Sequence, residues 1–70
     1  MSKLDLHGVK HQDVDLAVEN FIYLNQGEFP LKIICGNSTK MIDLVNNTIK
    51  RIGAKSSMFH HGIILIEGWK

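Results

Sequence analysis

The sequence has little cysteine, few aromatic residues and no long hydrophobic run, and each shortage excludes a class of protein. One cysteine among 70 residues excludes an internal disulfide framework and is typical of a protein from a reducing compartment. No apolar run approaches the roughly 18 residues of a membrane-spanning helix, and the amino terminus lacks the apolar centre of a signal peptide. We therefore expect a soluble, cytoplasmic protein with no membrane partner.

Charge of one sign is also scarce. The formal net charge is +1, and charged residues make up 21% of the chain, too few for a disordered protein. Hydrophobic residues make up 44%, a normal share for one globular domain, which we expect to span residues 1–70. This balance neither requires nor excludes nucleic acid, because a local basic patch can bind phosphate. With only three Phe, one Tyr and one Trp, phosphate contact is favoured over base stacking.

The segment Leu-Asp-Leu-His-Gly at positions 4–8 predicts a short strand that stops at its glycine. Alternation along a strand points Leu4 and Leu6 toward a core, and Asp5 and His7 toward the opposite face. A carboxylate beside an imidazole can orient the ring and stabilise its protonated form, so these two residues are candidates for acid–base chemistry. The alternative is an ordinary polar face on an outermost strand.

The next two segments complete a strand–helix–strand unit. Apolar residues spaced by three and four predict a helix that Gly27 stops, and Pro30 prevents its continuation. The residues of this stripe are Val14, Ala17, Val18, Phe21 and Leu24. The apolar run 31–35 then predicts a buried strand parallel to the first, since a helical crossover joins parallel strands. The carboxyl ends of both strands, at His7 and Cys35, should therefore lie at one edge of the sheet.

The second half of the sequence predicts another helix and two more strands. The apolar stripe of that helix is Met41, Val45, Thr48, Ile49 and Ile52. Gly53 stops the helix, and strands at 55–59 and 63–66 follow, joined by a turn at 60–62. The last strand is the most apolar and should be central. The fold class is therefore α+β, a two-layer βαβαββ sandwich with both helices on one face of a mixed four-stranded sheet.

The charged residues of both predicted helices suit the helix dipoles. Asp13, Asp15 and Glu19 lie in the first half of the first helix, where negative charge is favoured. Lys50 and Arg51 lie at the carboxyl end of the second helix, where positive charge is favoured. Both patterns support the helix predictions.

The turn that opens the second helix is a candidate anion site. A helix amino terminus presents unpaired N–H groups and a partial positive charge, and a glycine there permits close approach of a ligand. The residues that would contact the anion are Gly36, Asn37, Ser38, Thr39 and Lys40. The alternative is an ordinary capped helix with an exposed lysine. The turn lacks the spacing and the Gly-Lys-Ser/Thr ending of a P-loop.

The histidines and the cysteine are candidates for auxiliary roles. The residues that the topology can gather at one edge are His7, His11, Cys35, His60 and His61. Their spacing matches no familiar zinc pattern, so we expect no metal and no cofactor. A cysteine at the end of a strand is more often a small buried apolar residue than a nucleophile.

The opening Leu-Asp-Leu-His-Gly, the first helix, the Ile-Ile-x-Gly strand end and the second helix together resemble the small MutS-related (Smr) domain, over about residues 4–67. That family is a nucleic-acid-binding and nicking module for DNA or RNA. Its fold is similar to the carboxyl-terminal domain of translation initiation factor three. The resemblance implies that Asp5 and His7 take part in cleavage. It also implies that Gly36 is the first glycine of the family's second motif, His-Gly-x-Gly.

The sequence departs from that second motif. Cys35 stands where the motif has His, Ser38 stands where it has the second Gly, and Asn37 replaces the basic residue common between them. The family's glycine-rich hairpin is shortened to positions 60–62. The anion-binding helix end is kept, whereas the imidazole is lost. His60 or His61 can replace that imidazole if the third strand runs parallel to the first two.

Three functions stay open on the sequence. The first is an Smr-like domain that binds nucleic acid and cleaves phosphodiester bonds, with Asp5 holding His7 as general base or acid. The helix end at 36–40 would neutralise the phosphate. The second function is nucleic-acid binding without cleavage. The third is a protein-interaction module that uses the sheet face opposite the helices.

That opposite face has no helix to cover it. Ile34 and two of the four aliphatic residues at 63–66 would lie on it, and burying each such side chain contributes about 1.5–3 kcal/mol. Exposed apolar patches usually mark an interface, so we expect a two-fold homodimer through this face. The alternatives are that terminal residues such as Trp69 fold back over it, or that its partner is another molecule.

Overall fold

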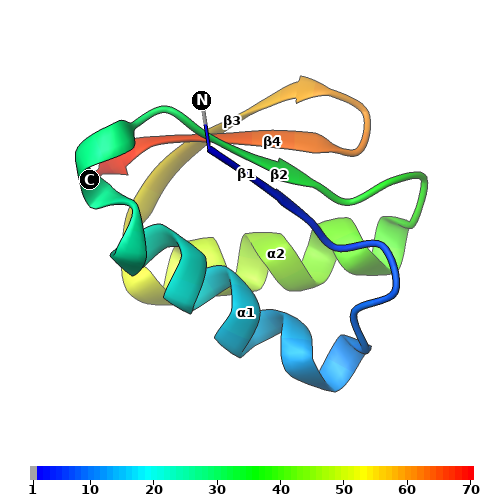
Figure 1. The fold of residues 1–70 in the computed structure, drawn as a ribbon. Coiled ribbons are helices and arrows are strands. Elements are labelled where there is room, and N and C mark those ends of the chain that lie inside the picture. Colours follow the sequence, from blue (N-terminus) through cyan, green and yellow to red (C-terminus); the bar gives the residue numbers. More distant parts are fainter. Residues whose placement is uncertain (1) are drawn as a thin grey trace.

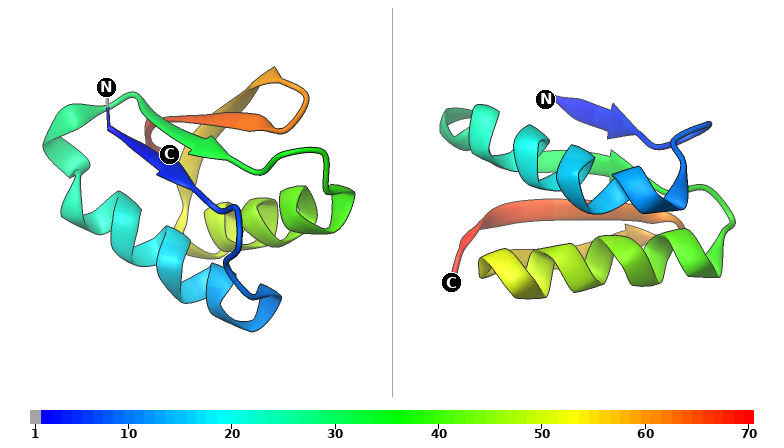
Figure 2. Two further views of the ribbon diagram at one scale, coloured as in Figure 1. Left: turned by 45° about the vertical axis from the view of Figure 1, so that its right-hand side comes forward. Right: turned by 90° about the horizontal axis from the view of Figure 1, so that it is seen from below.

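The computed structural model describes residues 2–70 and confirms the predicted fold class. The elements in chain order are β1 (Lys3–Asp5), α1 (His11–Leu24), the short 3₁₀ helix η1 (Gln26–Glu28), β2 (Leu31–Ile34), α2 (Thr39–Ile52), β3 (Ala54–His60) and β4 (Ile63–Trp69). The strands form one mixed sheet in the order β1-β2-β4-β3, so the most apolar strand is central, as predicted. Both helices cover the same face of this sheet (Figure 1, Figure 2).

The pairing of the strands sets the edge at which each one ends. β1 runs parallel to β2, β2 runs antiparallel to β4, and β4 runs antiparallel to β3. β3 therefore points the same way as β1 and β2, and all three end at one edge of the sheet. We call this the carboxyl edge and the other the amino edge. In Figure 1 the carboxyl edge carries the loops that lead into both helices and the β3–β4 turn.

Helix α1 packs through a narrower stripe than the sequence predicts. Val14, Val18 and Ile22 are fully buried, whereas Leu24 is 82% exposed and was wrongly placed in the stripe. Leu24 lies two positions after Ile22, which is about 200° around a helix, so burial of one exposes the other. The helix also ends at Leu24 rather than at Gly27.

Helix α2 matches its prediction closely. The Ser38 hydroxyl accepts a hydrogen bond from the Met41 N–H at 3.1 Å and caps the first turn. Gly53 ends the helix with a left-handed φ of 78°, a conformation that glycine adopts without strain. Its buried residues are Met41, Ile42, Val45, Thr48 and Ile49.

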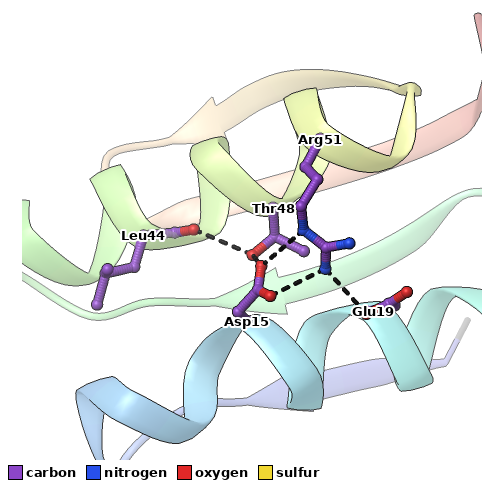
Figure 3. Close-up of polar contacts among 5 residues, drawn as sticks. All are labelled: Asp15, Glu19, Leu44, Thr48 and Arg51. Atoms are coloured by element: carbon purple, nitrogen blue, oxygen red, sulfur yellow. Dashed lines mark hydrogen bonds and ion pairs between the residues drawn. The ribbon is translucent and has the colours of Figure 1, made fainter.

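A polar cluster ties the two helices together on their outer side (Figure 3). The Arg51 guanidinium donates to Asp15 through Nε at 3.3 Å and Nη2 at 2.9 Å, and Nη2 also donates to Glu19 at 2.8 Å. The buried Thr48 hydroxyl donates to Asp15 Oδ1 at 2.6 Å. This hydrogen bond and the guanidinium lower the pKa of Asp15 against the opposing effect of desolvation. These residues therefore do more than complement the helix dipoles, because their hydrogen bonds also join α1 to α2.

The sheet face away from the helices is partly apolar, as predicted. Ile34 pairs with Ile63 across β2 and β4, and Leu65 follows two residues later on the same face. All three are half-buried, in contrast to the fully buried Ile64 and Ile66 that face the helices. The two-fold dimer through this face stays a prediction, which sedimentation at micromolar concentration tests by looking for twice the monomer mass.

Trp69 does not cover that face. Its ring packs beside Tyr23 at a centroid distance of 5.2 Å and edge-on to Phe29 at 6.2 Å. Its Nε1 donates to Gln26 Oε1 at 3.1 Å. The end of the chain therefore closes the amino edge on the helix side. Within residues 2–70, no helix has the length and apolar character needed to cross a membrane.

Candidate functional site

A shallow pocket lies at the carboxyl edge, where the parallel strands β1 and β2 end. Its volume is about 270 Å³, and it is lined by Asp5, His7, Ile34, Cys35 and Gly36. Asp5 pairs with Ile34 across the two strands, which puts the loops that follow them side by side. The predicted meeting of His7 and Cys35 at one edge is therefore found, and it produces a concave site.

The β1 side of the pocket is built differently from the prediction. The strand ends at Asp5, although the Leu6 N–H still bonds to the Ile34 carbonyl at 3.0 Å, and His7 lies in the turn that follows. Asp5 Oδ1 accepts a hydrogen bond from the His7 main-chain N–H at 2.9 Å. The carboxylate thus holds the turn, whereas the predicted role was to orient the imidazole. Both side chains are exposed to solvent.

The β2 side of the pocket is a main-chain turn. Gly36 has a φ of 71°, which lets the chain turn from β2 toward α2. Cys35 is 8% exposed, and burial raises the pKa of its thiol, so the thiol is neutral at neutral pH. This supports the interpretation of Cys35 as a small apolar residue rather than a nucleophile.

The β3–β4 turn supports the Gly36 turn through close main-chain packing. The Cys35 N–H donates to the Gly62 carbonyl at 2.6 Å. Gly62 is buried with a φ of 86°, and a Cβ atom there would overlap the carbonyl oxygen of Gly36. Only glycine permits this approach. This contact joins distant segments and does not follow from local sequence, in which the glycine of the turn at 60–62 is its one visible signal.

The amino end of α2 adjoins the Gly36 turn. Asn37, Thr39 and Lys40 are exposed there, and the first turn of the helix contains no acidic residue. The hydroxyl of Ser38 is occupied as the cap, so it is less available to a ligand than predicted. The N–H groups of Thr39 and Lys40 have no intrahelical acceptor, as at the start of any helix. The exposed side chains and the main-chain donors of the predicted anion site therefore lie together at the start of α2.

His60 and His61 lie at the carboxyl edge but not in the pocket. The direction of β3 places them at the predicted edge, and both are exposed. β3 is, however, on the far side of β4, three strand spacings from β1, or about 14 Å. Neither histidine lines the pocket. The structure therefore does not bring them beside His7 as replacements for the lost imidazole.

Within residues 2–70, no group of three or more His, Cys, Asp and Glu side chains is arranged to hold a metal ion. Comparisons of this chain with protein-family models, curated proteins and solved structures found no match. Membership of the Smr family thus stays a prediction, based on the motifs at positions 4–8 and 33–36.

Proposed function

We propose that this chain is an Smr-like nucleic-acid-binding domain that holds a phosphate of DNA or RNA at the carboxyl edge of its sheet. The observation that carries the proposal is the pocket in which Asp5 and His7 meet the Gly36 turn. A concave site with convergent polar groups is the usual form of a ligand site. In this site the polar groups adjoin the start of a helix, where a phosphate is favoured.

The charges around the pocket support binding on the α2 side. Lys40 in the first turn of a helix is disfavoured by a few tenths of a kcal/mol unless negative charge lies nearby, and a phosphate supplies that charge. The carboxylate of Asp5 repels a phosphate, but it is engaged by the His7 N–H on the β1 side. The phosphate oxygens therefore face Asn37 and Lys40, and the nucleic-acid strand passes His7 on the other side of the pocket.

Phosphodiester cleavage is a second candidate function, and the exposed imidazole of His7 in the pocket favours it. His7 would remove a proton from the attacking water or ribose hydroxyl, and the new P–O bond would form as the P–O bond to the leaving oxygen breaks. Solvent water would protonate the leaving oxygen, and the amino end of α2 would stabilise charge on the non-bridging oxygens. The neutral thiol of Cys35 adds no base to this reaction.

The decisive experiment incubates the pure protein with labelled single- and double-stranded DNA and RNA, with and without a divalent metal. Binding that weakens as salt rises supports the nucleic-acid-binding domain. If the wild type cleaves nucleic acid, and His7→Ala loses cleavage but keeps binding, the protein is also a nuclease. A protein that binds none of the four nucleic acids contradicts the proposal and favours the protein-interaction module.

A further inference from the structure

Phe59 is displayed on the surface at the carboxyl edge. Its side chain is 57% exposed, and the neighbouring Met58 is 48% exposed. Met58 pairs with Ile64 and His60 pairs with Ile63, so Phe59 is the extra residue of a bulge in β3. A bulge bends its strand and re-aims the side chain that it carries. This ring is therefore turned out of the sheet by the backbone.

The Phe59 ring contacts the ring of His60, which is itself exposed and does not bury it. Phe59 and His60 meet edge to face with their centroids 4.4 Å apart, and more than half of the Phe59 side chain stays open to solvent. The other ring-to-ring contacts of residues 2–70 join Tyr23, Phe29 and Trp69, all at the amino edge. Phe59 is thus an exposed aromatic residue at the carboxyl edge, where a partner can reach it.

The hairpin that carries Phe59 is fixed to the proposed phosphate site. The Gly62 carbonyl accepts the Cys35 N–H, and Gly62 packs directly on Gly36. β3 and β4 also pair along their whole length, so the tip of the hairpin has one position relative to the pocket. A chain bound at Gly36 would meet the aromatic ring next along the same edge.

We propose that Phe59 is a base-stacking residue, and that it directs this site toward single-stranded nucleic acid. The inference rests on the proposed function, because it takes the phosphate at the start of α2 as given. An aromatic side chain beside a phosphate-binding groove stacks on an unpaired base of any sequence. In a duplex both faces of each base are covered by neighbouring bases, so the ring has no base face to contact. The low aromatic content of the sequence favours phosphate contact over base stacking. Composition does not show, however, which aromatic ring is exposed beside the phosphate site.

The test measures binding of a short single-stranded thymidine oligonucleotide to the wild type, Phe59→Ala and Phe59→Trp. An abasic strand of equal length and a duplex are the matched ligands. Leu24→Ala is the matched protein control, since Leu24 is an exposed apolar residue in the last turn of α1. Circular dichroism of each variant shows that the fold is kept.

We expect Phe59→Ala to weaken binding of the thymidine strand between about 5-fold and 150-fold. The same change should leave the abasic strand and the duplex within about 2-fold, Phe59→Trp should restore binding, and Leu24→Ala should have no effect. Equal losses on the thymidine and abasic strands would overturn the stacking role. Unchanged binding in Phe59→Ala would also overturn it, while leaving the proposed phosphate site standing. A wild type that binds none of these ligands would remove the proposed function and this inference with it.

Discussion

The two edges of the sheet use their aromatic and polar groups in opposite ways. At the amino edge Tyr23, Phe29 and Trp69 pack against one another, and the indole N–H is bonded to Gln26. At the carboxyl edge Phe59 is exposed, and the β3–β4 turn meets the Gly36 turn through main-chain atoms. Side-chain packing thus closes one edge and contributes stability there. At the other edge, main-chain packing joins Gly62 to the Gly36 turn, while the side chains of His7, Lys40 and Phe59 stay exposed to solvent.

The largest effect that this comparison predicts is at Gly62. In Gly62→Ala, a methyl group meets the Gly36 carbonyl in a left-handed conformation, and we expect a loss of roughly 2 to 4 kcal/mol. Urea unfolding measures the loss. Gly8→Ala is the matched control, because its φ of 82° is similar but its Cβ has open space. That variant should lose only about 1 to 2 kcal/mol from its backbone conformation. Equal losses in the two variants would show that the Gly62–Gly36 contact is unimportant.

The next largest effect is a difference in stability between variants of the aromatic residues at the two edges. Trp69→Ala removes a partly buried ring from the amino edge and should cost roughly 2 kcal/mol. Phe59→Ala should change stability by less than about 0.5 kcal/mol, because its ring is exposed. Thermal unfolding of both variants provides the comparison. A large loss of stability in Phe59→Ala would mean that both edges use aromatic residues for folding.

The cluster between the helices should affect folding without affecting the carboxyl edge. The Thr48 hydrogen bond, followed by Arg51, lowers the pKa of Asp15 below its ordinary value of 3.8. The folded state therefore binds this proton less readily than the unfolded state. The resulting stability is present above about pH 4 and is lost as the pH falls through the lower, folded pKa. In Asp15→Asn this part of the acid transition should disappear, as followed by circular dichroism between neutral and acid pH.

The binding of nucleic acid at neutral pH should be the same for Asp15→Asn and the wild type, since Asp15 is not in the pocket. A change in affinity would mean that the packing of α1 on α2 sets the geometry of the carboxyl edge.

The smallest effect is expected at Lys40. Lys40→Ala should lower the dependence of log affinity on log salt by about 0.7 for a single strand, the value for one phosphate contact. Lys50, in the last turn of the same helix, provides the matched control. Lys50→Ala should leave the slope unchanged. Titrations at several salt concentrations measure both slopes, and an unchanged slope in Lys40→Ala would place that lysine outside the binding site.

The parts of the fold that were predicted correctly depend on local sequence. The stripe and caps of α2 follow from residue spacing, from the Ser38 hydroxyl and from Gly53, all within one short segment. The central position of β4 follows from its apolar composition. The end of α1 was predicted wrongly, because Gly27 is only one of several residues at which the chain can leave a helix. Asn25 closes the helix first, through its side-chain bond to the Phe21 carbonyl at 2.7 Å.

The candidate site was predicted in part. The helical crossover between parallel strands was enough to place His7 and Cys35 at one edge. The direction of the Asp5 hydrogen bond was not predictable, because the strand ends at Asp5, two residues before its predicted end at His7. Once His7 lies in a turn, its main-chain N–H, rather than its imidazole, donates to the Asp5 carboxylate.

The sequence by itself therefore determined the order of the elements, the two-layer class and the edge at which the polar motifs gather. These properties follow from periodicity and turn residues, which act over a few positions of the chain. Only the tertiary structure decided that β4 separates His60 from the pocket and that Gly62 packs on Gly36. It also decided that Arg51 reaches Asp15, 36 residues away. Each of these joins distant segments through contacts that exist only when both helices and all four strands are in place.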